Sequence, residues 1–565
     1  MYRFLFLFAL LFSGSVTDLL GQNLHLKIQN ESKEGTFVLD SIGYKKKHAD
    51  FNSLSLEIDT LKYKISNLGY IDAKWESLKK INDSVYESNL TLAKPYKSVD
   101  IYYDLEKLPP GTLKQLKVHS SKLYFTVPFR EIEQTLQFIN KKISDQGLPF
   151  TTLKLVNIKK TDQHTLKAEL TVSNIEQKRS VDKIVVKGYE QFPKSSLSYF
   201  LKLKTGRTLN LSEIKEQTNL LQEIPFASQI KDPEILFSKD STILYVYIEK
   251  VKSNTFDGFL GFGTNEETSK LELTGYLNLE LTNNLNSGES LSLAYRSDES
   301  DQKSFNVNVN LPYLFNTPIG TELELNIFKK DSSFTTADQS ARINYQLNPK
   351  NQFSVGIKST KSNNLLSSEN LNPFIKDYET SFYTVGYRFS NRSKEQSIFK
   401  RNAAIQLETG IGNREIAFNK DQQYQYNLNA FKIFNLNFKN SIYVRTNSFG
   451  LFSDSYLENE LSRFGGINSI RGFEENSLNA SFYGLLATEY RYSLSSNLYV
   501  HSIIDIAYFE NKIIDQKEKL YSFGFGFGLN TKAGLLRFNY ANGKSENQSF
   551  KLSNSKIHLS LSALF

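Results

Sequence analysis

A single arginine in a glycine-rich segment is the residue of this 565-residue sequence best suited to form a specific polar contact. Arg471 can donate hydrogen bonds to two carboxylates at once, because its guanidinium presents a planar fork of N–H groups. Glycines permit positive φ and a close approach of the backbone, so such a segment can fold tightly against another part of the protein. The segment contains Gly465, Gly466, Ile470, Arg471, Gly472 and Phe473.

Two carboxylates further along the chain are candidate partners of Arg471. Glu489 and Asp505 lie in successive stretches where apolar and polar residues alternate, and both belong to the polar faces. If the polar faces line the lumen of a barrel, both carboxylates project inward and can share Arg471 through charge-assisted hydrogen bonds. We expect the loop to fold over the glycines of residues 522–528. An ordinary glycine-rich loop, with carboxylates that only line a wet pore, is the alternative.

The other reactive residue types form no pattern typical of an enzyme. The sequence has no Cys, which excludes disulfides, thiolate metal sites and a cysteine nucleophile. It also lacks Gly-x-Ser-x-Gly, His-Glu-x-x-His and Gly-x-x-x-x-Gly-Lys, and its 6 His are scattered. We therefore expect no enzymatic activity, no cofactor and no metal site.

The composition excludes a bundle of membrane helices but not a membrane barrel. The mean hydropathy is −0.40, which is too polar for a helical bundle, whereas in a barrel only alternate residues face lipid. The formal net charge of +8 is spread along the chain without a patch of basic and aromatic residues. We expect no nucleic-acid partner.

The N-terminus is typical of a secretory signal peptide. Arg3 precedes an apolar run at residues 4–12, which is too short to cross a bilayer as a helix, and small residues follow. We expect cleavage after Gly21, so that residues 1–21 are a signal peptide and the mature chain is exported. A buried N-terminal strand or helix is the alternative.

Helix and strand patterns alternate over residues 22–251. The clearest unit, at residues 177–251, has the order strand, helix, helix, strand, strand, and Leu211, Ile214 and Leu221 recur at helical spacing in it. Similar but less clear units lie at residues 22–95 and 96–176. The first has a helix at 52–68 and strands near 71–77 and 85–92, and the second has a helix at 130–146 and strands near 98–103, 151–158 and 165–172. Three repeats of one small α/β unit are the simplest account.

From about residue 252 onward the pattern has period two. Sixteen alternating segments follow, and most are long enough to cross a bilayer as tilted strands. Connections after even-numbered segments are mostly short, whereas those after odd-numbered segments are often long, for example at residues 412–423, as in membrane barrels. We predict a 16-stranded antiparallel transmembrane β-barrel over residues 252–565, with a soluble β-sandwich as the alternative. The segments begin near residues 255, 268, 287, 303, 319, 338, 351, 378, 399, 424, 440, 482, 497, 520, 532 and 554.

The first of these segments contains three glycines. Gly258, Gly261 and Gly263 offer no packing side chains, so this strand could form a weak seam with the last strand of the barrel. Curvature at a barrel corner is the alternative reason for these glycines.

Several of these motifs together resemble a known family. Residues 465–473 are similar to the signature loop of BamA/TamA-type outer-membrane assembly factors (the bacterial surface antigen family), which centres on Val-Arg-Gly-Phe/Tyr. The similarity continues at residues 489–492 and 503–507, where the family has Phe-x-Asp-x-Gly, and ends with the aromatic Phe565, which resembles the C-terminal strand signal. Residues 181–251 resemble a POTRA domain, with Val-Lys-Gly-Tyr at residues 186–189.

The resemblance implies both a fold and a role. It implies α+β POTRA repeats of β-α-α-β-β order in the periplasm, followed by a 16-stranded barrel in the bacterial outer membrane. It also implies that the protein assists the insertion, assembly or translocation of other proteins without a cofactor. The implied partners are unfolded outer-membrane or exported protein clients, the lipid bilayer and periplasmic accessory proteins. A two-partner-secretion-type transporter, or another barrel pore, is the alternative function.

Overall fold

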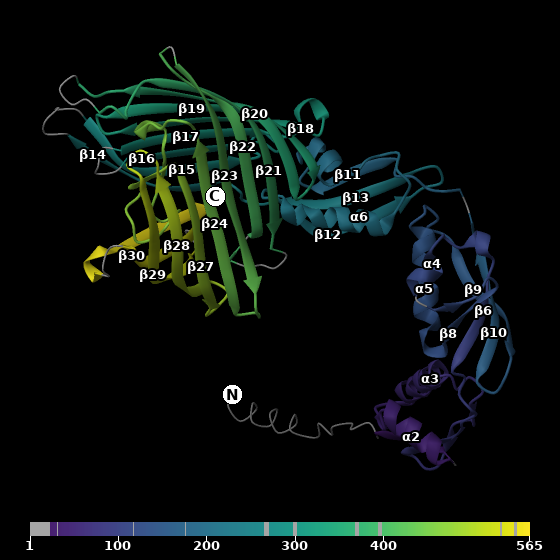
Figure 1. Ribbon diagram of the computed structural model, residues 1–565. Helices are drawn as coiled ribbons and strands as arrows, with labels where there is room; N and C mark the ends of the chain where they lie inside the picture. Colours follow the sequence, from purple (N-terminus) through teal and green to yellow (C-terminus); the bar gives the residue numbers. More distant parts are fainter. Residues whose placement is uncertain are drawn as a thin grey trace, which may run out of the picture. The chain divides into compact units, whose positions relative to one another are not determined.

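The chain divides into two compact units, Met1–Ser180 with Thr208–Leu211, and Val181–Arg207 with Ser212–Phe565 (Figure 1). The computed structural model describes residues 23–564, apart from 31, 117, 176, 265–270, 298–301, 368–371, 394–397, 400, 418, 532–533 and 547–550. The predicted signal peptide and Phe565 lie outside the described residues. In the part of the chain that is described, no helix is both long and apolar enough to cross a bilayer.

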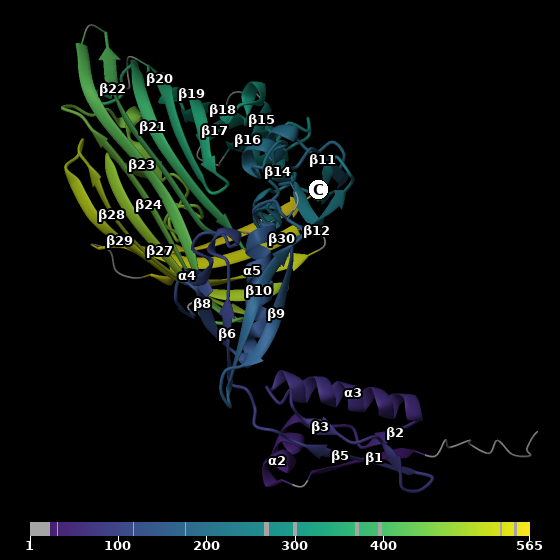
Figure 2. The same cartoon turned by 90° about the vertical axis from the view of Figure 1, so that its right-hand side faces the viewer.

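The first repeat is a small sheet packed against helices (Figure 2). Asp50 is the N-cap of helix α3. Its carboxylate accepts from the backbone N–H of Ser53, and the Ser53 hydroxyl accepts from the backbone N–H of Asp50, as in a capping box. The buried face of the helix includes Leu54, which clusters with Leu26 of β1. Helix α2 was not predicted. The elements are β1 (Leu24–Asn30), α2 (Lys33–Ile42), β2 (Lys47–His48), α3 (Phe51–Asn67), β3 (Lys74–Trp75), β4 (Lys79–Lys80) and β5 (Val85–Thr91).

The second repeat has a five-stranded sheet in the order β7-β8-β6-β10-β9. Helix α5 buries Ile139 and Ile143 in one cluster with Phe125 and Leu166 of the sheet. The predicted strands and helix are present, but the two-residue strand β7 and the five-residue strand β8 were not predicted. The elements are β6 (Ser98–Tyr102), η1 (Leu105–Lys107), α4 (Thr112–Leu116), β7 (His119–Ser120), β8 (Tyr124–Pro128), η2 (Phe129–Glu131), α5 (Ile132–Ser144), β9 (Thr152–Lys160) and β10 (Thr165–Ser173).

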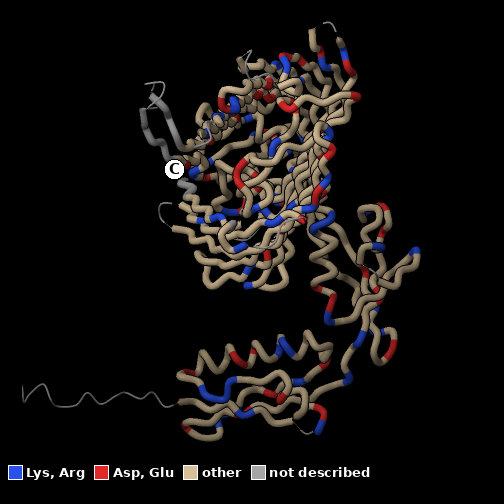
Figure 3. Tube along the Cα trace, turned by 60° about the vertical axis from the view of Figure 1, so that its left-hand side comes forward, with Lys and Arg blue, Asp and Glu red and all other residues tan. Residues whose placement is uncertain are grey.

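Polar contacts join the first repeat to the second. The Asp72 carboxylate accepts hydrogen bonds from Lys160 Nζ at 2.7 Å and from Tyr96 Oη at 2.8 Å. The backbone N–H of Tyr96 donates to the carbonyl of Gly69 at 2.9 Å. Acidic and basic residues both occur along the chain (Figure 3), and α3 carries Glu57 and Asp59 followed by Lys62 and Lys64.

The third repeat has the predicted order of elements, and its sheet has the strand order β11-β13-β12. The first of its two helices is a single π turn that ends where Leu201 N–H donates to the Ser196 carbonyl. The elements are β11 (Lys183–Gly188), η3 (Ser196–Phe200), α6 (Leu211–Asn219), η4 (Leu220–Glu223), β12 (Ala227–Phe237) and β13 (Thr242–Lys250).

The rest of the chain forms the predicted barrel (Figure 1). Sixteen described strands pair antiparallel in chain order, and the first meets the last. The strands are β14 (Thr255–Thr264), β15 (Leu271–Thr282), β16 (Ser290–Ser297), β17 (Gln302–Leu311), β18 (Ile319–Lys330), β19 (Phe334–Asn348), β20 (Asn351–Asn364), β21 (Tyr378–Arg392), β22 (Arg401–Ile416), β23 (Asn419–Asn435), β24 (Asn440–Phe452), β27 (Phe482–Ser493), β28 (Leu498–Asn511), β29 (Gln516–Thr531), β30 (Gly534–Ser545) and β31 (Ser555–Leu564).

Side chains alternate strictly between the two faces of the barrel wall. On β21, Tyr383 and Val385 are exposed on the outer face, while Thr380 and Thr384 are buried inside. Exposed apolar residues on the outside of a closed barrel are suited to contact lipid. The polar interior and apolar exterior therefore agree with the predicted transmembrane barrel.

The predicted long loop at residues 412–423 is wrong. Strands β22 and β23 continue to pair as far as Ile416 and Asn419, so the connection is a tight hairpin. This part of the hairpin is polar on both faces, with Asn413 opposite Gln422 on one face and Arg414 opposite Asp421 on the other. Period two disappears from the sequence wherever neither face needs to be apolar, although the backbone pairing persists.

The third repeat contacts turns at one end of the barrel, which we call the near end. The Tyr189 hydroxyl donates to Asn286 Oδ1 and accepts from Asn283 Nδ2, both at 2.8 Å, in the turn between β15 and β16. The Tyr199 hydroxyl donates to the Asn316 carbonyl in the turn η5 (Leu314–Asn316) between β17 and β18. Glu223 accepts from the backbone N–H of Arg392 at the end of β21. The connections after the first barrel strand, β14, and after every second strand from there along the barrel lie at the opposite, far end.

Candidate functional site

Neighbouring strands place the two predicted carboxylates on the inner wall. Glu489 is on β27 and Asp505 is on β28, where Asp505 pairs with Ala487. Asp505 is fully buried and Glu489 is 8% exposed. Both side chains therefore lie inside the barrel and away from bulk water, as the alternating pattern predicted.

The glycine-rich loop between β24 and β27 enters the lumen from the far end. A short hairpin, β25 (Ser462–Phe464) and β26 (Leu478–Ala480), leads into it, and Gly465 and Gly466 both have positive φ. Gly472 has a φ of +80°, and a Cβ there would lie 2.4 Å from the backbone nitrogen of Gly543 on β30. Only glycine allows this approach of two backbones.

The wall that the loop contacts differs from the predicted one. We expected the loop over the glycines of β29, but Tyr499 crowds Gly528 and His501 crowds Gly526. Gly543 on β30 is the position that meets the loop, through the Gly472 carbonyl and the Phe473 ring. Side chains of β28 fill the space that the small residues of β29 leave.

Arg471 makes a fork-shaped contact with both carboxylates. Its backbone N–H and Nε donate to Asp505 Oδ2 at 3.1 and 2.8 Å, its Nη2 donates to Asp505 Oδ1, and its Nη1 donates to Glu489 Oε1. The Arg471 side chain is only 5% exposed. Burial lowers the pKa of Arg471, but Asp505 and Glu489 raise it more, so it lies above the ordinary value. Arg471 thus remains charged in its buried position.

A second arginine extends the network, and the sequence analysis did not single it out. Arg491 Nε donates to Glu489 Oε2 at 2.7 Å, and its guanidinium lies 4.0 Å from the Tyr443 ring centre and 4.3 Å from that of Phe399. Positive and negative groups therefore alternate from Asp505 through Arg471 and Glu489 to Arg491. Arg491 lies two residues after Glu489 and therefore on the same inner face, and this spacing is the sequence signal that could have identified it.

The sequence also did not predict a hydrophobic cluster between the loop and the barrel wall beside this network. Ile470 is fully buried, and Phe464 stacks on Tyr483 with ring centres 4.5 Å apart. Both loop residues pack in a cluster that includes Phe509 and Leu520 of the barrel wall. The signal was the break in alternation on β28, where Ala507 and Phe509 are apolar although they share the inner face with Asp505.

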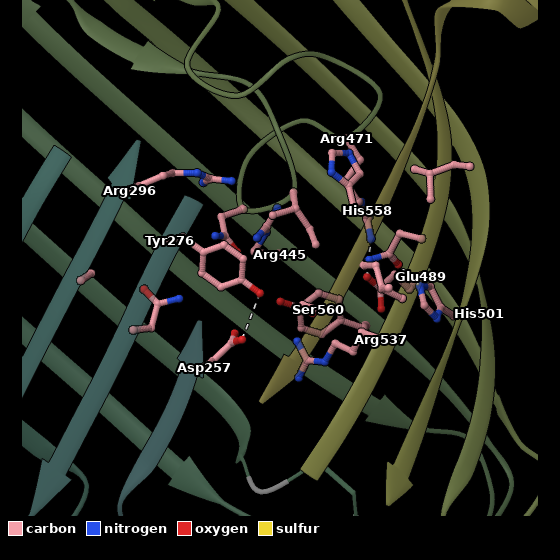
Figure 4. A pocket seen from close by; sticks show the side chains of 18 of the residues that line it. Asp257, Tyr276, Arg296, Arg445, Arg471, Glu489, His501, Arg537, His558 and Ser560 are labelled. Atoms are coloured by element: carbon pink, nitrogen blue, oxygen red, sulfur yellow. Dashed lines mark hydrogen bonds and ion pairs between the residues drawn. The ribbon is translucent and has the colours of Figure 1, made fainter. Parts of the chain in front are cut away.

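A cavity of about 640 Å³ lies in the lumen next to this network (Figure 4). Its walls include Arg296, Arg537 and His558, and Asp257 of β14 accepts a hydrogen bond from Tyr276 of β15 at 3.1 Å. The described residues include no group of three or more His, Cys, Asp or Glu that could hold a metal ion. The cavity is bounded by strands on both sides of the junction between β14 and β31.

That junction is weakly paired. Among the described residues, strands β14 and β31 pair at two positions, Thr255 with Leu564 and Phe256 with Ala563. Strands β15 and β16, among the most briefly paired of the other described neighbours, pair at eight positions from Gly275 to Thr282. Gly258 also lets β15 approach closely, since a Cβ there would lie 2.9 Å from the Tyr276 carbonyl. We call the β14–β31 junction the seam.

Solved structures resemble this chain in fold, although comparisons of its sequence find no match. No family model matches the sequence, and no curated protein matches it. BamA from Haemophilus ducreyi lacking POTRA domains 1–3 has a TM-score of 0.51 and 16% identity, over 82% of this chain and 99% of that chain. CdiB from Acinetobacter baumannii and CdiB from Escherichia coli each have a TM-score of 0.51, with 14% and 12% identity, over 83% of this chain and 90% of theirs.

These comparisons confirm the predicted fold. The chain has the fold shared by BamA and CdiB, with POTRA-like repeats before a 16-stranded barrel. Identities of 12–16% establish the fold alone.

Proposed function

We propose that this chain is a bacterial outer-membrane protein that helps other proteins insert into or cross that membrane. The seam is the observation that carries the proposal, because two paired positions hold β14 to β31. A membrane strand with unpaired backbone groups is strongly disfavoured in lipid, so a barrel rarely opens along a fully paired junction. A junction with few hydrogen bonds costs far less to separate.

An open seam presents a strand edge to a client. An unfolded chain can add to such an edge through backbone hydrogen bonds, which require little of the client's side-chain sequence. The lipid-facing outer wall continues on both sides of the seam, so a strand added there also reaches the bilayer. Insertion by this route uses no chemical step, and we propose that the protein is not an enzyme.

The repeats offer further edges for strand addition. β9 is an edge strand of the second repeat, and β12 is an edge strand of the third. Each exposes apolar residues, Ile158 at 57% on β9, and Ile230 at 53% and Leu236 at 50% on β12. Unfolded outer-membrane or exported clients are the partners that these edges suit, and the near-end position of the third repeat suggests that the repeats face the periplasm, where accessory proteins could bind them.

A transport function is the second candidate. The fold is as similar to that of CdiB as to that of BamA, with a TM-score of 0.51 in each case. A two-partner-secretion-type transporter needs an open lumen, whereas here the loop is held in the lumen by Arg471. A lumen occupied by the loop favours insertion of clients at the seam over their transport through the lumen.

Reconstituted liposomes separate the two functions. Urea-unfolded outer-membrane barrels are diluted onto vesicles with and without this protein, and their folding is followed by gel mobility. Faster folding in the presence of the protein supports insertion. No acceleration with several clients, together with steady ion conductance in the same membranes, favours a transporter or channel.

A further inference from the structure

The outer half of the loop between β24 and β27 has a second anchor that the Arg471 network does not explain. Residues 455–460 include the helical turn η6 (Glu458–Glu460) at the far end of the barrel. They contact strands on the other side of β24 from Arg471. The whole loop therefore bridges two parts of the barrel wall.

Arg414 of β22 is the centre of this second anchor. Its side chain is fully buried, and it donates to Glu460 Oε1, to Asp421 Oδ2 of β23 and to Ser455 Oγ. The Glu460 side chain is 4% exposed and also accepts from Gln423 Nε2 at 3.1 Å and from the Leu457 N–H at 2.9 Å. A buried carboxylate with this many donors holds its segment in one position.

The two residues before Glu460 add contacts to other strands. Asn459 is 2% exposed and donates to Ser362 Oγ of β20 and to the Lys376 carbonyl, both at 2.8 Å. Glu458 accepts from Lys330 Nζ of β18 at 3.0 Å and from Asn372 Nδ2 at 2.9 Å. Three consecutive side chains thus reach three different parts of the wall, which spreads this segment across the far mouth of the lumen.

A cavity of about 360 Å³ lies beneath this segment and is lined by Asn459, Glu460 and Arg463 together with strand residues. Residues 455–460 therefore lie over a cavity and not over a packed core. Since the cavity walls carry Asp338 and Lys358, water and ions can occupy it.

We propose that Arg414 is a second positioning residue of the loop, and that its contact with Glu460 keeps residues 455–460 closed over the far mouth of the barrel. Arg471 holds the inner half of the loop, and Arg414 holds the outer half. Releasing the outer half opens an ion-conducting path. The proposal rests on the chain being a membrane barrel, not on its action on clients, so it can fail while the insertion assay succeeds.

The test is the conductance of the full-length protein in planar bilayers. Glu460→Gln keeps the shape of the side chain and removes its charge. Loss of a hydrogen bond between charged groups is expected to raise the open probability roughly tenfold to a hundredfold. The double variant Arg414→Gln with Glu460→Gln is expected to open less than the combined effects of the two single variants predict, since the residues act as a pair.

Glu415→Gln is the matched control. Glu415 and Lys420 form an ion pair at 2.7 Å on the same hairpin, but both side chains are 58% exposed. The conductance of the Glu415→Gln variant is expected to equal that of the wild type. Gel mobility without heating measures the amount of folded barrel for each variant, and conductance is compared at equal folded amounts.

Hydrogen exchange of residues 455–460 gives a second readout on the same samples. Exchange is expected to be faster in Glu460→Gln and unchanged in Glu415→Gln. If Glu460→Gln conducts no more than the wild type at equal folded amounts, the proposal is overturned, whatever the exchange rate. Equal opening by Glu415→Gln overturns it too.

Discussion

Arg471 and Asp505 lie 34 positions apart in the chain, and three hydrogen bonds from the backbone N–H, Nε and Nη2 of Arg471 end on the one carboxylate of Asp505. The aspartate therefore fixes both the backbone and the side chain of the loop residue. A carboxylate that only lined a wet pore would not be fully buried, as Asp505 is. The contact sets the position of the whole loop in the lumen.

Replacing Arg471 with alanine is expected to release the inner half of the loop while the barrel still forms. The substitution leaves Asp505 and Glu489 buried without this cation, and breaking such a buried pair costs about 3–5 kcal/mol. Limited proteolysis of residues 463–477 in the folded barrel measures the release. We expect faster cleavage and slower folding of clients in the liposome assay.

Arg471→Lys is the informative comparison. Lysine keeps the charge but cannot form the fork that reaches two carboxylates, so an intermediate cleavage rate is expected. If Arg471→Ala has normal activity and an unchanged cleavage rate, the loop does not depend on this contact.

The pairing of Arg471 with Asp505 is expected to appear as strong coupling. Asp505→Ala should resemble Arg471→Ala, and the double variant should be less destabilised than the sum of the two by about 1–3 kcal/mol. Urea unfolding of the barrel, followed by gel mobility, measures each free energy. The exposed pair Lys361 and Glu379, at 2.6 Å, is the control cycle, with an expected coupling below about 1 kcal/mol. Additive effects at Arg471 and Asp505 would contradict the pairing.

Gly472→Ala is expected to displace the loop from β30. A Cβ at Gly472 would lie 2.4 Å from the Gly543 nitrogen, and φ is +80°. Gly206 has a similar φ of +78° with no neighbour within 4 Å, so Gly206→Ala shows the cost of the backbone conformation alone, about 1 kcal/mol. Protease cleavage of the loop is expected to increase for Gly472→Ala and not for Gly206→Ala. Equal behaviour of the two variants would mean that the close approach is unimportant.

Acid is expected to loosen the junction between the first two repeats. Hydrogen bonds from Lys160 and then Tyr96 lower the pKa of Asp72 below its ordinary value of 3.8. A lowered pKa in the folded state means that the contact is fully stabilising above pH 3.8 and is lost as the pH falls through the lowered value. Asp72→Asn should therefore loosen the junction already at neutral pH.

Energy transfer between dyes on the full-length chain measures this junction. The sequence has no Cys, so Lys47→Cys and Lys154→Cys supply the only two attachment sites. A wider distance distribution is expected for Asp72→Asn at pH 7 and for the parent protein in strong acid. Identical distributions for the parent and for Asp72→Asn at pH 7 would show that Asp72 does not hold the repeats together.

The sequence predicts the barrel well because lipid on one side and water on the other force strict alternation. The strand starts predicted at residues 255, 319, 351, 378, 440 and 482 coincide with those of β14, β18, β20, β21, β24 and β27. The prediction fails where that constraint ends, as in the two-residue connection between β22 and β23. It also fails for very short elements such as β7, whose two residues cannot show a period.

The site could be predicted in its chemistry but not in its full geometry. Alternation alone places Glu489 and Asp505 on the inner face, and their charge makes Arg471 the natural partner. Which strand lies under the loop depends on the curvature of the closed wall, so Gly543 was missed. The Arg414 anchor was missed because Arg414 and Glu460 lie 46 positions apart, in segments that show no shared pattern.

Locking the seam tests the central claim most directly. Thr255→Cys and Leu564→Cys place a cysteine pair across one of the two paired positions of β14 and β31. Ser292→Cys and Asn308→Cys place a control pair across β16 and β17, which pair along the whole of β16. Both oxidised proteins are compared in the liposome folding assay. We expect the locked seam to abolish acceleration of client folding, a reductant to restore it, and the control pair to have no effect. Full acceleration with the seam locked would contradict insertion through the β14–β31 junction.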